Sequence, residues 1–268
     1  MNKRKNDEIR SAVRENYGKV AASGSAGCGC SPLFCCGTPG AVRTTDISIG
    51  LGYSSEDVAA VPEGANMGLG CGNPQAIASL QPGETVLDLG SGGGVDCFLA
   101  VRAVGDKGYV IGVDMTPEMI TTSRRNAEKA GFRNVDFRLG ELENLPVADG
   151  IVEVIISNCV INLSPEKQKV FNEAFRVLKP GGRLAISDIV ATAEMPDIVK
   201  KDMAMYTGCV SGASSIPELE SMLRQAGFEN IRIRPKDESK TFIRDWAPGS
   251  RIEDYIVSAT IEGVKPKA

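Results

Sequence analysis

The chain has 268 residues, of which 42% are hydrophobic and 24% charged, and its formal net charge is −4. This is the composition of an ordinary globular protein, and the slightly acidic balance gives no reason to expect a nucleic acid or an anionic membrane as partner. Histidine is absent, which excludes the commonest general base and every histidine-ligated metal site. Any catalysis must therefore depend on carboxylates, thiols, amides or an organic cofactor.

The expected compartment follows from the N-terminus and the apolar patterning. The first residues, MNKRKNDEIR, lack the apolar core of a secretory signal. No apolar stretch approaches the roughly 18 residues that a membrane-spanning helix needs. We therefore expect a cytoplasmic protein, in which the eight cysteines would be free thiols used for metal binding or redox chemistry.

The elements predicted in chain order alternate between strands and helices. Helical spacing predicts a packing helix over 5–20, and a loop rich in glycine, serine and proline with four cysteines follows over 21–40. The predicted strands are 85–89, 109–114, 135–139, 151–157, 183–190, 231–235 and 254–263. The predicted helices between them are 95–104, 117–130, 165–178 and 216–227, the last capped by Ser215 with Pro217 in its first turn.

This alternation predicts an α/β fold with a mostly parallel sheet. We expect three regions: an N-terminal helix and cysteine-rich segment over 1–80, the core of the sheet over 81–195, and an insertion followed by the last part of the sheet over 196–268.

A glycine-rich turn stands between the first predicted strand and the helix after it. In VLDLGSGGGVD, residues 86–96, glycines let the backbone approach a ligand where the N–H groups of a helix point outward. Val95 occupies the third glycine position of a dinucleotide fingerprint, which argues against a nicotinamide dehydrogenase. Asp114, at the end of the second strand, is placed to accept hydrogen bonds from a ribose, while Asp88 could hold a positive ligand or brace the turn.

Together with VLKPGGRLAISD at 177–188, this arrangement resembles the class I S-adenosylmethionine (SAM)-dependent methyltransferases. The resemblance implies a Rossmann-like, mostly parallel seven-stranded sheet with helices on both faces, a final antiparallel strand, and SAM as cofactor. It also implies a cofactor site formed by Asp88, Gly90, Ser91, Gly92, Asp114, Met115, Glu141 and Asn158.

Three cysteines stand in short motifs: Cys71 in GLGCGNP, Cys159 in SNCVIN after the fourth strand, and Cys209 in YTGCVSGA. Cys71 or Cys159 alone could be a packing residue, as we expect of Cys97 inside a helix, whereas Cys209 stands among glycine and serine in a loop where a structural thiol has less reason to be. Sulfurs converging from a loop, a strand end and an insertion would suit a soft, thiophilic acceptor. Trivalent arsenic bound by three thiolates keeps a lone pair that can attack a sulfonium methyl group. No proton leaves the attacking atom, so the absence of histidine is no obstacle.

With these cysteine motifs, the sequence resembles the arsenite methyltransferases. The motifs SNCVINLSPEKQ, GCGNP and GCVSGA, with YGKV at 17–20, carry the resemblance over roughly residues 15–260. It implies methyl transfer from SAM to arsenite in arsenic detoxification, with Cys71, Cys159 and Cys209 as the As(III) ligands.

The resemblance also implies a thiol–disulfide relay that is reset by thioredoxin or glutathione. An upstream cysteine takes part in it, and the candidates here are Cys28, Cys30, Cys35 and Cys36. The family has one cysteine where this sequence has a dense cluster, so the resemblance does not single out one of them. A structural zinc site with four thiolate ligands is an alternative role for this cluster, although adjacent cysteines are a poor pair for one tetrahedral ion.

Two other classes of protein fit parts of the pattern. A SAM-dependent C- or O-methyltransferase of a small organic molecule would tolerate serine at Cys159 and Cys209. A non-catalytic metalloid- or zinc-binding protein would bind arsenic without the cofactor and would be indifferent to Asp114→Ala. Our expectation is an arsenite methyltransferase that acts as a monomer, without a nucleic acid or membrane partner. The number of methyl groups added is left open.

Overall fold

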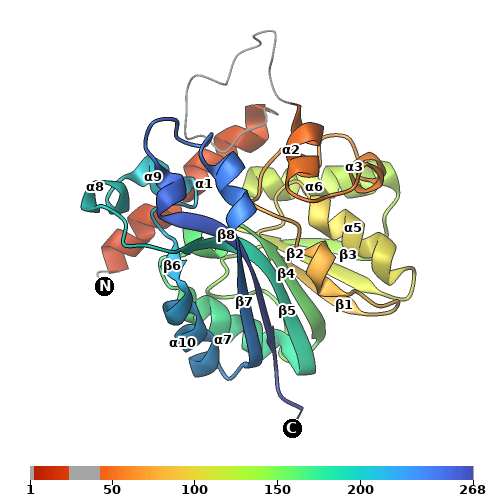
Figure 1. Cartoon of the computed structure of the whole chain (residues 1–268). Helices are drawn as coiled ribbons and strands as arrows, with labels where there is room; N and C mark the ends of the chain where they lie inside the picture. The colour runs from red at the N-terminus through yellow and green to blue at the C-terminus, as the bar shows by residue number, and fades with distance from the viewer. Residues whose placement is uncertain (1–2, 24–42, 268) are drawn as a thin grey trace.

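The computed structural model describes residues 3–23 and 43–267 and contains one eight-stranded sheet with the order β3-β2-β1-β4-β5-β8-β7, in which β6 pairs with β5 (Figure 1). The strands are β1 (Thr85–Leu89), β2 (Tyr109–Asp114), β3 (Val135–Leu139), β4 (Val152–Asn158), β5 (Leu178–Ala191), β6 (Ser214–Ser215), β7 (Glu229–Lys236) and β8 (Ile256–Val264). β8 runs antiparallel to both of its neighbours, and β1 to β5 pair in parallel. The predicted seven-stranded, mostly parallel sheet is confirmed, with the two-residue β6 as an addition.

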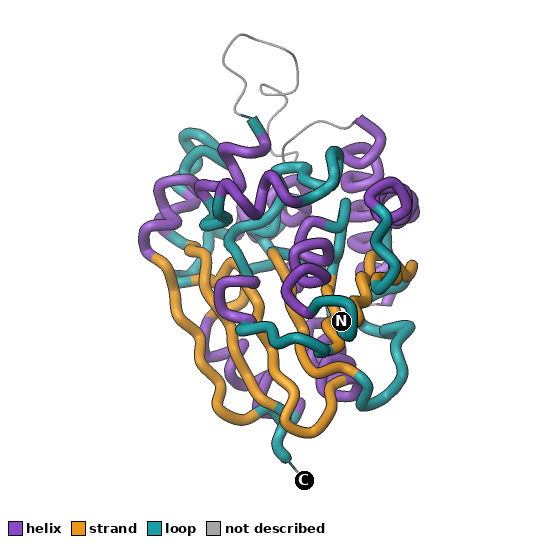
Figure 2. Tube along the Cα trace, turned by 90° about the vertical axis from the view of Figure 1, so that its right-hand side faces the viewer, coloured by secondary structure: helices purple, strands orange, loops and turns teal. Residues whose placement is uncertain are grey.

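Helices cover both faces of this sheet and the edge where its parallel strands end (Figures 1 and 2). The helices are α1 (Lys3–Ser23), α2 (Thr44–Gly50), α3 (Ser55–Ala60), α4 (Gln75–Ala78), α5 (Val95–Val104), α6 (Pro117–Ala130), α7 (Lys167–Val177), α8 (Asp197–Lys200), α9 (Met203–Thr207), α10 (Ile216–Ala226) and α11 (Lys240–Ile243), with short 3₁₀ turns η2 (Ile161–Leu163), η3 (Asp237–Ser239) and η4 (Ile252–Asp254). Among the described residues, no helix combines the length and the apolar character needed to cross a membrane.

Two apolar layers hold the helices to the sheet. Along β1, Leu87 and Leu89 join the layer under α7 and α10, whereas Val86 joins the layer under α5 and α6. Successive side chains of a strand point to opposite faces, so a strand that is covered on both sides is apolar throughout. This explains why the apolar run predicted as a buried strand became β4, with Val154 and Ile155 in different layers.

Local sequence signals set several element boundaries. Pro117 begins α6, and Gly131, in the left-handed region at φ +74°, ends it. Ser215 caps α10 through a capping box with Glu218, as the sequence predicted for the serine. β5 begins at Leu178 rather than at the predicted Arg183, because Leu178 already pairs with Val152 of β4 across an irregularity in the register.

The segments outside the regular core gather at one end of the sheet. The predicted N-terminal helix is confirmed as α1 and buries Ile9 and Val13 there. α2, α3 and α4, which the sequence analysis did not predict, lead from the N-terminal part to β1. Because the parallel strands β1, β2 and β4 all end at this edge, whatever binds there contacts side chains from widely separated parts of the chain.

Candidate active site

A cleft lies over the carboxyl ends of β1, β2 and β4. Ligands of open α/β sheets bind outside the carboxyl ends of the strands, which is where this cleft lies. Most lining residues come from α1, from 48–70, from the glycine-rich turn and α5, from the ends of β2 and β4, and from the loop at 208–209, and others come from 142–143, from 163–165 and from Trp246.

The glycine-rich turn forms the cofactor half of this cleft. Gly92 donates its N–H to Asp114 Oδ2 at 3.0 Å, and Thr116 donates its N–H to Asp114 Oδ1 at 2.8 Å. The backbone thus fixes this carboxylate at the end of β2, and each oxygen keeps capacity for another bond. Ser91 Oγ lines the cleft and is buried without a hydrogen-bond partner among the described residues. Such a hydroxyl is costly unless a ligand bonds to it, so the turn fits the predicted contacts of Ser91, Gly92 and Asp114 with SAM.

Packing against Val160 requires a glycine at position 90. Its φ is +75°, and a Cβ there would lie 2.5 Å from Cγ2 of Val160. No larger residue could occupy this position without moving Val160, which follows Cys159. The turn is therefore pressed against the segment that carries one of the predicted sulfur ligands.

Buried acids give the cofactor half a negative character. Asp88, Asp96 and Asp114 all line the cleft. Burial raises the pKa of Asp88 well above its ordinary value, that of Asp96 to about 6, and that of Asp114 upward. A nearby cation favours the ionised forms, so this half of the cleft suits a ligand that carries a sulfonium or ammonium group. Asp88 also accepts a hydrogen bond from Cys97 Sγ at 3.3 Å, and Cys97 is fully buried, as predicted.

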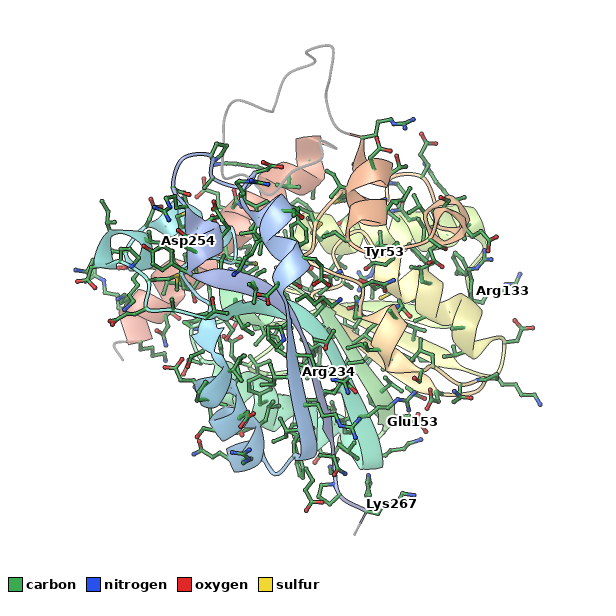
Figure 3. The ribbon with its side chains drawn as sticks, in the orientation of Figure 1. Tyr53, Arg133, Glu153, Arg234, Asp254 and Lys267 are labelled. Carbon is green, nitrogen blue, oxygen red and sulfur yellow. The ribbon has the colours of Figure 1, made fainter. Side chains whose placement is uncertain are left out.

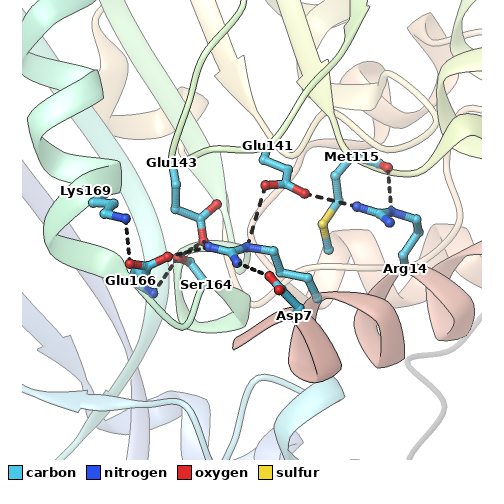
Figure 4. Close-up of polar contacts among 9 residues, drawn as sticks. Asp7, Arg14, Met115, Glu141, Glu143, Ser164, Glu166 and Lys169 are labelled. Atoms are coloured by element: carbon cyan, nitrogen blue, oxygen red, sulfur yellow. Dashed lines mark hydrogen bonds and ion pairs between the residues drawn. The ribbon is translucent and has the colours of Figure 1, made fainter. Parts of the chain in front are cut away.

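The two predicted adenine neighbours lie in different environments. Met115 lines the cleft. The Glu141 carboxylate instead faces α1, where it pairs with Arg14 at 3.1 Å and Arg10 at 3.6 Å, and Glu143 lines the cleft in its stead (Figure 4). Arg14 also donates to the Met115 carbonyl oxygen at 3.3 Å. Helix α1 therefore covers the position that the family resemblance gives to Glu141.

A network of ion pairs holds α1 in this place. The Arg10 side chain, only 12% exposed, contacts Glu143 at 3.2 Å and Glu166 at 2.6 Å. Glu143 also accepts a hydrogen bond from Ser164 Oγ at 2.6 Å. At the other end of the helix, Tyr17 donates to the carbonyl oxygen of Thr207 at 3.2 Å. One helix thus contacts both the cofactor half and the loop before Cys209.

The three predicted sulfur ligands meet in the other half of the cleft, here called the sulfur half. Cys71, Cys159 and Cys209 are free and buried, with 1%, 9% and 3% exposure. The sulfur atoms of Cys71 and Cys159 lie within 4.8 Å of each other. Cys209 Sγ is 2.9 Å from the Cys159 carbonyl oxygen. Cys159 and Cys209 line the cleft, and so does Gly70 beside Cys71. Segments far apart in the sequence therefore bring three thiols to one place.

Two of these cysteines have an unusual backbone conformation. Cys159 has φ +56° and Cys209 has φ +63°, a region that costs roughly 1–3 kcal/mol for a residue other than glycine and that occurs often at functional sites. Backbone hydrogen bonds hold both: Cys159 donates its N–H to the Ser187 carbonyl oxygen at 2.8 Å, and Cys209 donates its N–H to the Tyr206 carbonyl oxygen at 3.0 Å. Asp188 accepts the Ile161 N–H at 2.9 Å and so fixes the turn that follows.

The electrostatics of the sulfur half favour neutral thiols. Burial raises the pKa of Cys71, and hydrogen bonding to Cys209 and to Cys71 raises the pKa of Cys159 well above its usual range. A carboxylate oxygen of Asp188 lies within 4.8 Å of the sulfurs of Cys71 and Cys159, and burial raises the pKa of Asp188 to about 6. Without a bound ligand, Cys71 and Cys159 are therefore protonated at neutral pH.

Several lining residues were missed by the sequence analysis, namely Arg10, Tyr17, Tyr53, Asp96 and Trp246. Tyr53 donates its hydroxyl to both oxygens of the Asp96 carboxylate, at 2.9 and 3.0 Å. Asp96 could have been found from its place in the first helical turn after the glycines. Tyr53 and Trp246 lie in segments without a periodic pattern, so no local signal marks them.

The relay candidates Cys28, Cys30, Cys35 and Cys36 lie outside the described residues, and so does the alternative zinc site. Within the described ranges, one group of side chains could supply three ligand atoms to a single ion, and it comprises Cys71, Cys159 and Asp188. This group belongs to the sulfur half of the cleft.

The fold and the cleft define the class of protein. The strand order with one antiparallel strand inserted, the glycine-rich turn and the acid at the end of β2 are those of a class I SAM-dependent methyltransferase. A family model described as a methyltransferase domain matches residues 80–227. The predicted fold class and the use of SAM are confirmed.

Comparisons with individual proteins identify the family. An arsenite methyltransferase of Halobacterium salinarum is 55% identical over 263 residues, which are 97% of this chain and 67% of that protein. One of Aquipseudomonas alcaligenes is 39% identical over 218 residues, which are 76% of this chain and 62% of that protein. The crystal structure of an arsenic(III) S-adenosylmethionine methyltransferase from Chlamydomonas reinhardtii matches with a TM-score of 0.62 and 28% identity, over 84% of this chain and 74% of that one.

The chain therefore belongs to the arsenite methyltransferase family, and these relatives support SAM-dependent methylation of arsenic as its activity. It spans about two thirds of the length of the two curated relatives, 67% and 62% respectively.

Proposed function

We propose that this chain binds trivalent arsenic through Cys71, Cys159 and Cys209 and methylates it with SAM. The observation that carries this proposal is the convergence of three buried, free thiols beside a cleft whose other half suits a sulfonium nucleoside. A buried group of cysteines with no disulfide would be an unusual neighbour for an organic substrate, whereas soft thiolates are preferred ligands of thiophilic elements.

Loading of arsenic requires no base. Arsenite at neutral pH carries three hydroxyl groups, and each thiol that forms an As–S bond releases its proton to the hydroxyl that departs as water. Three thiols therefore give a three-sulfur complex and three water molecules, with charge and protons balanced. The raised pKa values of Cys71 and Cys159 are compatible with this route, because the neutral thiol is the reactant and the proton is used in the exchange.

The contribution of the chain to methyl transfer is alignment and exclusion of water. Bound SAM supplies an electrophilic methyl group. Three sulfur ligands leave arsenic one lone pair as the nucleophile, and no proton has to be removed from it. The buried cysteines and apolar neighbours such as Leu163 and Val160 keep the reacting groups dry, and such positioning accounts for several kcal/mol of a barrier, on the order of 7–11 in favourable cases.

The residues that hold the cofactor divide by the group they recognise. Asp114 keeps acceptor capacity for a ribose diol, and Ser91 offers its unpartnered hydroxyl. Asp88 and Asp96 provide the negative surroundings for the sulfonium and ammonium charges. Asn158, at the end of β4, would contact the cofactor, although its amide already makes three hydrogen bonds within the protein.

A thiol reductant completes the cycle. After the methyl group has bonded through the lone pair, arsenic has formally lost two electrons. Two cysteines return them and form a disulfide, which thioredoxin or glutathione then reduces by exchange. We propose Cys71 and Cys159 as one such pair, because their sulfurs lie within 4.8 Å of each other. We place this chemistry in the cytoplasm, where such reductants are present, and in a monomer.

The test incubates the purified chain with arsenite, SAM and a thiol reductant and separates the arsenic species by chromatography with elemental detection. The wild type is compared with Cys159→Ser and Cys209→Ser. We expect methylated arsenic from the wild type alone. If both variants methylate arsenite as well as the wild type, the three-sulfur site is wrong. If the wild type binds SAM but forms no methylated arsenical, a methyltransferase of organic molecules becomes the better account.

A further inference from the structure

The loop that carries Cys71 is held by one side chain from a distant strand. Asn158, at the end of β4, accepts the Cys71 N–H on Oδ1 at 3.0 Å and donates from Nδ2 to the Gly72 carbonyl oxygen at 2.7 Å. Gly70 makes this approach feasible, since a Cβ there would lie 2.8 Å from Asn158 Nδ2. Because Asn158 directly precedes Cys159, a single amide sets the relative positions of two sulfur ligands.

The same amide is connected to the cofactor half of the cleft. Asn158 Nδ2 also donates to the Tyr53 hydroxyl at 3.0 Å, and that hydroxyl donates to the Asp96 carboxylate at 2.9 Å. Tyr53 and Asp96 are 6% and 8% exposed, and all three residues line the cleft. Figure 3 labels Tyr53, which comes from the segment after α2 and lies over the end of the sheet. We call the three residues the Asp96–Tyr53–Asn158 bridge.

The strength of this bridge depends on the charge at its cofactor end. An ionised carboxylate accepts a hydrogen bond about twice as strongly as a neutral acceptor. In a buried chain of hydrogen bonds, a stronger first bond polarises the next one. A cation bound beside Asp96 would favour its ionised form, tighten the bond from Tyr53, and make the Tyr53 oxygen a better acceptor for Asn158. The amide that holds Cys71 would then be fixed more firmly.

We propose that the Asp96–Tyr53–Asn158 bridge couples occupancy of the cofactor cleft to the placement of Cys71, so that arsenite binds more tightly when the cleft holds a positively charged SAM-like ligand. Tyr53 and Asn158 are positioning residues in this account, because they act through Cys71 rather than on arsenic. The inference rests on the proposed role of Cys71 as an arsenic ligand. Linkage then requires that arsenite raise the affinity for the cofactor by the same factor.

The experiment measures arsenite affinity by titration calorimetry with and without saturating sinefungin, a SAM analogue that carries an amine and transfers no methyl group. It is done at pH 5, where Asp96, whose pKa burial raises to about 6, is mostly protonated until a cation binds. The chain used has Cys28, Cys30, Cys35 and Cys36 replaced by serine, so that arsenic binding reports the sulfur half alone. We expect sinefungin to tighten arsenite binding by about fivefold or more, the lower end of typical coupling between sites. Tyr53→Phe should reduce this factor to near one; the factor is the ratio of two arsenite affinities measured in the same variant, so a change in its affinity without sinefungin cancels.

The controls separate this inference from the proposed function. Tyr109→Phe, at the exposed start of β2, removes a hydroxyl far from the cleft and should keep the full coupling. If Tyr53→Phe lowers thermal stability too far for titration, Asp96→Asn removes the charge at nearly the same volume. It should show the same loss at a sinefungin concentration that a separate titration shows to saturate this variant. Equal coupling in Tyr53→Phe and wild type, or none in wild type, would overturn the inference. Failure of the four-serine chain to bind arsenite at all would overturn the proposed three-thiol site instead.

Discussion

The two halves of the cleft are built by different means. In the cofactor half, the ligand-facing groups come from a strand end, a glycine-rich turn and a helix start, and backbone N–H groups orient Asp114. In the sulfur half, the ligands come from three irregular positions, and two of them have a left-handed backbone. Regular structure thus suffices to place a carboxylate beside a nucleoside, whereas three converging thiols need loops that tertiary contacts hold in strained shapes.

The largest expected effect is a loss of arsenic methylation that leaves SAM affinity nearly unchanged. Cys159→Ser removes one of three soft ligands. Mutating residues that only support the ligands of a bound metal already lowers affinity or activity by about 10–100-fold, so we expect arsenic methylation to fall by more than ~100-fold. SAM binding should stay within about twofold, because Cys159 is on the other side of the cleft. Turnover and calorimetric SAM affinity measure the two quantities. A comparable loss of SAM affinity would show that the halves are not independent in this direction.

A change in the cofactor half should give the reverse pattern. Asp114→Asn keeps the shape but removes the charge, and the loss of a charge-assisted bond of about 1.5–3 kcal/mol predicts SAM binding weaker by roughly 10–100-fold. Arsenite affinity measured without cofactor should be unchanged. Unaltered SAM affinity in this variant would exclude Asp114 as the ribose acceptor.

The acids of the cofactor half predict a pH dependence. Burial raises the pKa of Asp96 to about 6, and the titratable groups around it are Asp88, Asp57 and the neutral Tyr53 hydroxyl. Since a cationic ligand needs the ionised form, SAM affinity should fall by about tenfold from pH 7 to pH 5. Asp96→Asn should flatten this dependence. A profile that is the same in both proteins would assign the titration to another group.

In the ligand-free protein, ionisation of Asp96 should lower the free energy of unfolding. A carboxyl whose folded-state pKa is raised stabilises the fold below its unfolded pKa, and that stabilisation is lost as the pH rises through about 6. The free energy of unfolding of the ligand-free chain should therefore decline over this window while SAM affinity rises. Urea titrations of wild type and Asp96→Asn at pH 4.5 and 7 would measure the difference.

The smallest effect concerns the helix that covers both halves. Arg14 and Glu141 pair at 3.1 Å, but both side chains are about 40% exposed, and such pairs contribute about 0–1 kcal/mol. Arg14→Ala should weaken SAM binding by less than about fivefold, with a reduced response to added salt. Lys19→Ala, whose pair with Glu15 is exposed on the same helix, is the matched control. A loss of tenfold or more would mean that Arg14 contacts the cofactor directly.

The sequence predicted most of the fold because the sheet core has strong local patterns. Apolar runs, glycine stops and the serine cap of α10 predicted the longer strands and helices from Thr85 onward, whereas the short elements α8, α9, α11 and β6 were not predicted. Through their motifs the sequence also singled out Cys71, Cys159 and Cys209, which the structure brings to one place as buried, free thiols. Glu141 was expected at the adenine edge, but the structure turns it toward Arg10 and Arg14, and no periodic pattern could reveal an ion pair between elements so far apart.

What the sequence could not predict lies in the contacts between loops. Nothing in the segment around Tyr53 indicates that its hydroxyl bridges Asp96 and Asn158. Likewise, the glycine after Cys71 resembles an ordinary turn residue, yet a Cβ at Gly72 would lie 2.1 Å from Ser187 Oγ. These positions are determined by tertiary packing, which single-sequence patterns do not encode.

The most direct test of the account is X-ray absorption spectroscopy at the arsenic edge on the arsenite-bound chain, with Cys28, Cys30, Cys35 and Cys36 replaced by serine. The account predicts three sulfur neighbours of arsenic, and two sulfurs and one oxygen when Cys71, Cys159 or Cys209 is also changed to serine. A first shell of oxygen alone, or a three-sulfur shell that survives each of these changes, would contradict it.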